Sequence, residues 1–92
     1  MRTDDLNNDI LSIHKLEKDI ENCNKEIEKR TKIVNETELV KGDDLSTVIK
    51  NNKRRAIQMN AVFERLLFEK NKEIAKQKIN SLRLKLDDEI DN

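Results

Sequence analysis

The chain has 92 residues, of which 41% are charged and 35% hydrophobic, with zero net charge, one glycine and no proline. Soluble globular domains are nearer half apolar and a quarter charged, so this chain cannot build a thick core around itself. No stretch is apolar enough to cross a membrane and no apolar leader opens the chain, so we expect an intracellular protein without a membrane anchor. The single cysteine excludes a disulfide framework.

The first predicted element is a helix over about residues 4–41. Thr3, followed by two aspartates, is a typical helix-start signal. Apolar residues then recur every seven positions, which is the pattern of a coiled-coil seam. These are Leu6, Ile13, Ile20, Ile27 and Val34, with Leu16, Cys23 and Arg30 at the intervening seam position.

A turn is predicted at about residues 42–43. Gly42 is the only strong helix breaker in the chain, and it suits the left-handed position just past a helix end. Lys41 complements the negative end of the helix dipole, and Asp43 or Asp44 can accept the free amide hydrogens of the next helix.

The second predicted helix covers about residues 44–90 and carries two apolar stripes that are out of phase. The 45–66 stripe follows alternating four- and three-residue steps through Leu45, Ile49, Asn52, Ala56, Met59, Phe63 and Leu66. The 68–86 stripe contains Phe68, Ala75, Ile79, Leu82 and Leu86. Where the stripes meet, Leu66, Leu67 and Phe68 span too wide an arc for one neighbouring helix to cover. A stutter in a two-stranded coil is the alternative.

The two seams match if the chain folds back on itself. A turn at 42–43 places Ile27 opposite Met59 and Cys23 opposite Phe63, with Leu66 on the same intrachain seam. Residues 1–46 carry a net charge of −4 and residues 47–92 a net charge of +4, so the halves attract. The sequence therefore predicts an all-α fold, a single antiparallel helical hairpin over residues 1–92 that joins a helix bundle with partner chains.

A two-helix hairpin lacks an enclosed core and normally needs a partner. We predict that a second copy or a different protein covers the apolar surface around Leu66–Phe68. The predicted interface comprises Val62, Phe63, Leu66, Leu67, Phe68, Ile74, Leu82 and Leu86.

Arg30 interrupts the first seam and has two interpretations. Its charged head reaches water while its stem packs, or it pairs with a buried acceptor and fixes the register. In the predicted pairing it faces Asn52, Arg55 and Ala56, none of which is a carboxylate, so a partner chain would supply the acceptor.

No residue pattern predicts chemistry. His14 has no second ligand at metal-binding spacing, and Cys23 fits the seam as a small apolar group. The sequence has no glycine-rich phosphate loop or nucleophile motif, and two rods do not readily form a pocket. We therefore expect no catalytic, metal or cofactor site and no enzymatic activity.

The predicted function is that of a non-catalytic coiled-coil subunit, a scaffold or adaptor in a larger complex. The first alternative is nucleic-acid binding, because residues 50–85 hold 11 basic and 3 acidic side chains and begin with Lys50, Lys53, Arg54 and Arg55. Stacking aromatics and DNA-reading motifs are missing. In size, composition and shape the chain resembles the small helical subunits of kinetochore, vesicle-tethering and splicing complexes. It also resembles the helical-hairpin tubulin chaperones, which implies a second alternative, a hairpin that holds a client protein.

Overall fold

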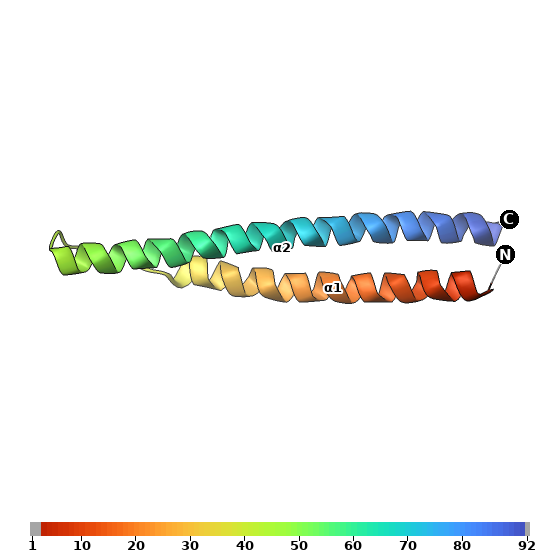
Figure 1. The fold of residues 1–92 in the computed structure, drawn as a ribbon, viewed down its shortest axis with the longest axis horizontal. Helices are drawn as coiled ribbons and strands as arrows, with labels where there is room; N and C mark the ends of the chain where they lie inside the picture. Colours follow the sequence, from red (N-terminus) through yellow and green to blue (C-terminus); the bar gives the residue numbers. More distant parts are fainter. Residues whose placement is uncertain (1–2, 92) are drawn as a thin grey trace.

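The computed structural model describes residues 3–91, which form two long helices packed side by side in opposite directions (Figure 1). α1 spans Thr3–Glu36 and α2 spans Leu45–Asp91. The start of α1 and the end of α2 lie at the same end of a rod measuring 72 × 14 × 14 Å. The radius of gyration is 21.1 Å, against about 12 Å for a compact domain of this length. The predicted all-helical antiparallel hairpin is confirmed.

The heptad of α1 faces α2, as the sequence predicts. Ile13 is buried, and the other members of this seam are half-buried: Leu6, Leu16, Ile20, Cys23, Ile27, Arg30 and Val34. Because a seven-residue repeat returns these side chains to one edge of the helix, α2 covers that edge along its whole length. The remaining surface of α1 is mostly charged and polar, which keeps it in water.

α2 faces α1 with a seam that the hydrophobic pattern only partly reveals. Its covered positions follow alternating three- and four-residue steps: Asn51, Arg54, Gln58, Ala61, Arg65, Phe68, Lys72, Ala75, Ile79, Leu82, Leu86 and Glu89. The 68–86 stripe makes up most of the second half, where Ala75 and Ile79 are buried. The first half of the seam is polar or small, which explains why the sequence did not identify it.

The 45–66 stripe does not face α1, and that prediction is wrong. The predicted register places Met59, Phe63 and Leu66 against the seam of α1. All three side chains are exposed in the structure, that of Leu66 by 53%. The inner positions beside them, Gln58 and Ala61, are covered instead. The stripe therefore lies on the outside of α2.

The two helices are also shifted along each other relative to the prediction. The sequence places Arg30 opposite Arg55, but Arg30 bonds to Glu64, nine residues further along α2. Nearer the loop, Gln58 Nε2 donates to the backbone carbonyl of Val34 at 3.0 Å, which is consistent with the same alignment. The shift arises because the connection is much longer than a two-residue turn.

The connection, residues 37–44, runs beside the first turns of α2, and α2 projects beyond the end of α1 (Figure 1). Asn51 binds both backbone groups of Val40: the Val40 amide donates to Oδ1 at 2.9 Å, and Nδ2 donates to the Val40 carbonyl at 2.7 Å. Arg54 Nη1 donates to the carbonyl of Glu38 at 3.1 Å. We call the seam of α2 that faces α1 the inner seam. Its first, polar half binds backbone, whereas its second half packs against side chains.

α1 ends at Glu36, earlier than the predicted end at about residue 41. The Thr37 hydroxyl donates to the carbonyl of Ile33, and Gln58 bonds the carbonyl of Val34, so two terminal carbonyls have partners outside the helix ladder. Beyond them, the bonds from Asn51 and Arg54 hold the backbone in its non-helical path. Side chains of α2 therefore replace the predicted helical turn.

An aspartate just before α2 caps the start of that helix, as predicted. The Asp44 carboxylate accepts a hydrogen bond from the Thr47 hydroxyl at 2.6 Å and one from the Thr47 amide at 3.3 Å, and these bonds lower the pKa of Asp44. Gly42 has φ +150°, and a Cβ there would lie 3.2 Å from Asp44 Oδ1. Gly42 therefore shapes the entry to α2 and does not cap α1, which corrects the prediction.

Candidate partner-binding surface

α2 carries two heptad seams on opposite sides. All seven members of the 45–66 stripe are exposed, while the covered inner seam begins at Asn51 and runs to Glu89. Each residue turns an α-helix by about 100°, so positions such as Met59 and Phe63 point away from α1 when Gln58, Ala61 and Arg65 point toward it. The 45–66 stripe has the spacing by which coiled-coil helices recognise each other.

The 45–66 stripe has a defined end. Continued at the same spacing, it meets Lys70, Glu73 and Gln77, which are all exposed polar residues. Leu84 returns to the same side of α2 as an isolated leucine, 67% exposed. The apolar surface therefore spans about three heptads, the length over which a partner helix would pack knobs into holes.

The structure divides the predicted interface residues between two surfaces. Phe63 and Leu66 belong to the 45–66 stripe, and Leu67 and Ile74 are exposed beside it or further along α2. Val62 is half-buried, and Phe68, Leu82 and Leu86 are half-buried members of the inner seam that faces α1.

A second apolar surface is the open groove between the helices. Leu16 and Cys23 of α1 and Phe68, Ile74 and Ala75 of α2 line it, and its volume is about 390 Å³. Asp19, Asn22, Glu26, Asn71 and Lys78 complete the lining. This mixture of charged and apolar side chains makes the groove a less continuous apolar surface than the 45–66 stripe.

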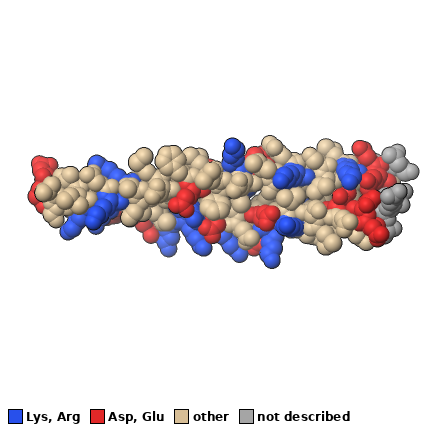
Figure 2. All heavy atoms as spheres, viewed as in Figure 1, with Lys and Arg blue, Asp and Glu red and all other residues tan. Residues whose placement is uncertain are grey.

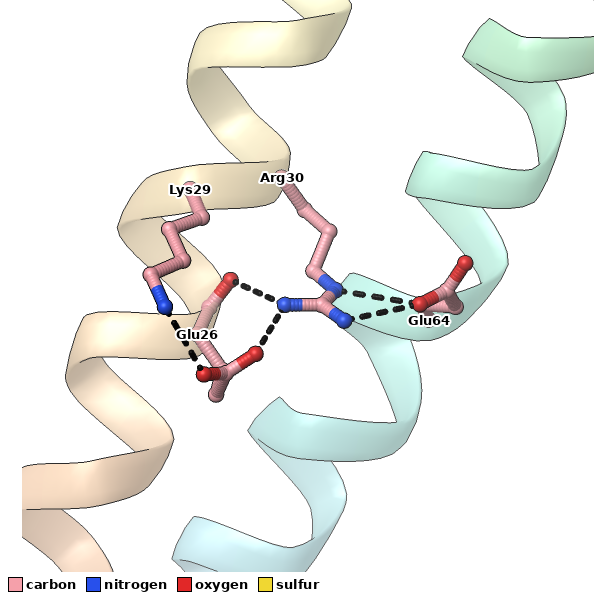
Figure 3. A network of polar contacts seen from close by, with 4 residues as sticks. All are labelled: Glu26, Lys29, Arg30 and Glu64. Atoms are coloured by element: carbon pink, nitrogen blue, oxygen red, sulfur yellow. Dashed lines mark hydrogen bonds and ion pairs between the residues drawn. The ribbon is translucent and has the colours of Figure 1, made fainter.

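Arg30 reaches across from α1 to α2 and is bonded on both sides (Figure 3). Its Nη2 and Nε donate to Glu64 Oε2 at 2.8 and 3.2 Å, and its Nη1 donates to the Glu26 carboxylate. The guanidinium carbon lies 4.8 Å from the centre of the Phe68 ring, within cation–π distance. Arg30 therefore pairs within its own chain, and the expectation of a carboxylate from a partner is wrong.

These bonds change the protonation equilibria of the groups involved. The hydrogen bond to Glu64 raises the pKa of Arg30, and the hydrogen bonds from Arg30 and then Lys29 lower the pKa of Glu26. The sequence missed Glu64 because the predicted register was displaced. The structure shows Arg30 paired, but its acceptor on α2, Glu64, is exposed and not buried as that interpretation expected. A bond that joins the two helices at one position fits a role in setting register.

Further ion pairs join the acidic helix to the basic one, as the charge asymmetry predicts. Glu17 Oε1 lies 3.2 Å from Arg83 Nη2, and Asp9 Oδ2 lies 3.1 Å from Lys85 Nζ. The Asp9 carboxylate beside Lys85 raises the pKa of that lysine. These pairs use two of the basic side chains within residues 50–85, Arg83 and Lys85, which makes both less available for binding other molecules.

The basic cluster at the start of α2 is split by the fold. Arg54 turns inward and bonds the carbonyl of Glu38, while Lys50, Lys53 and Arg55 are exposed. By helical position, Lys53 and Arg55 lie on either side of the 45–66 stripe. Figure 2 shows an uncharged stretch along the α2 edge of the molecule, bordered by basic side chains toward the loop.

Within residues 3–91 no group of His, Cys, Asp and Glu side chains is placed to hold a metal ion. His14 is exposed and Cys23 is half-buried in the seam. Neither α1 nor α2, over the same residues, has an apolar run sufficient to span a membrane. Comparisons of the chain with family models, with curated protein sequences and with solved structures found no match.

Proposed function

We propose that this chain is a non-catalytic coiled-coil subunit that binds protein partners, acting as a scaffold or adaptor in a larger intracellular complex. The observation that supports this most is the second heptad seam, the 45–66 stripe, which is fully formed on the outside of α2 and exposed over its whole length. A seam of this kind has no use within the hairpin, because the inner seam already binds α1.

The small core supports the same proposal. The hydrophobic residues buried in the described part of the chain are Ile13, Ala61, Ala75 and Ile79, two of them alanines. Small scaffolds with so little buried apolar surface usually gain stability from a further element such as oligomerisation. Packing a third helix on α2 would bury Met59, Phe63 and Leu66, which are each more than half exposed.

The test compares two leucines on the same side of α2. Leu66 lies in the 45–66 stripe, and Leu84 is equally a surface leucine but lies outside it. The tagged chain, Leu66→Asp and Leu84→Asp are used as baits in the native source, followed by quantitative mass spectrometry. We expect a defined set of proteins to be lost with Leu66→Asp and retained with Leu84→Asp. Identical recovery with all three baits would contradict the proposal. Stripe-dependent recovery of unfolded clients alone would favour the chaperone-like alternative.

A second candidate function is nucleic-acid binding. Lys50, Lys53 and Arg55 are exposed near one end of the rod, where they can contact phosphates. Phosphate contacts lose affinity steeply as salt rises, so a gel shift with duplex and single-stranded DNA and RNA at two salt concentrations tests this candidate. Absence of any shift at low salt would remove it.

A further inference from the structure

The charges around the 45–66 stripe indicate what kind of helix can cover it. In a coiled coil, the residues that flank the seam contact the partner's flanking residues and set partner choice. Here the flanking positions nearest the middle of the stripe are Lys53 and Arg55, both exposed. Glu64, the one carboxylate within residues 45–66, is turned toward α1 and bonded to Arg30.

We infer that the 45–66 stripe binds an amphipathic helix of a different protein, about three heptads long, with carboxylates flanking its apolar seam. This inference rests on the proposed function and names the chemistry of the partner. Carboxylates opposite Lys53 and Arg55 would convert two exposed cations into ion pairs at the edge of the new contact. A lysine-rich helix would meet repulsion at the same places.

A second copy of the chain fits this surface less well. Self-pairing of the stripe in antiparallel orientation has its two-fold axis near Ala56, which brings Arg55 of both copies to the same edge of the contact. In parallel orientation Lys53 and Arg55 again find no carboxylate, because within residues 45–66 the positions that flank the stripe carry none. Like charges facing each other across a seam oppose association.

Asn52 adds a feature to the expected partner. It is the one polar member of the 45–66 stripe, and it lies one step before Ala56 at the centre. A polar residue within a seam disfavours an all-apolar neighbour and specifies register. The partner helix is therefore expected to place a polar side chain opposite Asn52 and a larger apolar one opposite Ala56.

The experiment uses two synthetic helices that differ only in charge. Each has three heptads with leucine at the seam and one asparagine at the seam position next to the central one, where it can lie opposite Asn52. One has glutamate at every flanking position and the other has lysine. Binding of the fluorescently labelled peptides to the full chain is measured by anisotropy. We expect the glutamate peptide to bind about tenfold more tightly than the lysine peptide, with the difference shrinking as salt rises.

Three variants locate the binding. Leu66→Asp should weaken binding of the glutamate peptide by about 100-fold or more, because an unpaired carboxylate would be buried in an apolar contact. Leu84→Asp should leave it unchanged. Changing Lys53 and Arg55 together to glutamate should reverse the preference toward the lysine peptide. Circular dichroism checks that each variant keeps its helix content, as expected for exposed positions.

Several outcomes would overturn the inference. Equal binding of both peptides through Leu66 would show that the stripe binds helices without regard to charge, which contradicts the acidic partner and leaves the proposed function standing. A chain that is dimeric by light scattering, that Leu66→Asp makes monomeric, and that excludes both peptides would identify a second copy as the occupant. Binding of neither peptide by a monomeric chain would contradict the inference, and the comparison of baits would then decide the proposed function separately.

Discussion

Asn51 binds the connection between the helices, and replacing Asn51 tests how residues 37–44 are aligned on α2. Asn51→Ala removes both hydrogen bonds to the backbone of Val40. Each such bond contributes about 0.5–1.5 kcal/mol net, so the loss is about 1–3 kcal/mol. Alanine recovers about 0.5 kcal/mol through its better helix propensity. We therefore expect the free energy of unfolding to fall by about 0.5–2.5 kcal/mol.

The assay is urea unfolding followed by circular dichroism, with Asn80→Ala as the matched control. Asn80 is also in α2 and exposed, and within residues 3–91 the structure shows no side-chain hydrogen bond for it, so this change should stabilise by about 0.5 kcal/mol. Hydrogen exchange of the Val40 amide gives an independent measurement, because that amide loses its acceptor in Asn51→Ala. Equal stability of the two variants, with unchanged exchange at Val40, would refute the alignment of residues 37–44 on α2.

Three further results are expected. Cys23 lines the same groove as Asn71, so Asn71→Cys should form an intramolecular disulfide with Cys23 under mild oxidation. Phe63→Cys should not form one. The opposite result would restore the register first predicted from the sequence. Gly42→Ala should lower the melting temperature in a thermal melt monitored by circular dichroism, because φ is +150° and the added Cβ would lie 3.2 Å from Asp44; an unchanged melt would show that this turn is not strained. The lowered pKa of Asp44 means that its ionised form stabilises the start of α2. This stabilisation is present at pH values above the unfolded pKa and is lost as the pH falls through the folded pKa. An acid titration should therefore destabilise the native chain more than it destabilises Asp44→Asn.

The sequence was sufficient for the architecture. The heptad of α1, the near absence of helix breakers and the opposite charges of the two halves together predicted an antiparallel hairpin, and the structure has that form. It also predicted that Asp43 or Asp44 caps the start of α2, and Asp44 does so; this was predictable because N-capping depends on residues within one turn of each other. These features are local or periodic, so they can be read without knowing which residues meet.

The sequence did not determine which stripe of α2 faces α1. Apolar spacing favoured the 45–66 stripe, because hydrophobic periodicity cannot identify a seam that binds backbone through polar side chains. A signal was present: the heptad of the 68–86 stripe, extended toward the loop, leads from Phe68 to Ala61 and then Arg54, both covered in the structure. The outward position of the 45–66 stripe, which makes it a candidate partner surface, follows from that choice.

What the sequence alone determined about this protein is therefore its helices, their antiparallel pairing and the presence of more apolar surface than one partner helix can cover. Only the tertiary structure decided the register, the pairing of Arg30 with Glu64 and the side of α2 that remains exposed. The physical reason lies in residues 37–44. The side chains of Asn51 and Arg54 form hydrogen bonds with the backbone of residues 37–44, and these bonds replace a last helical turn of α1. They join residues that are distant in the sequence. A longer non-helical connection moves every contact of α1 along α2, and no local pattern records its length.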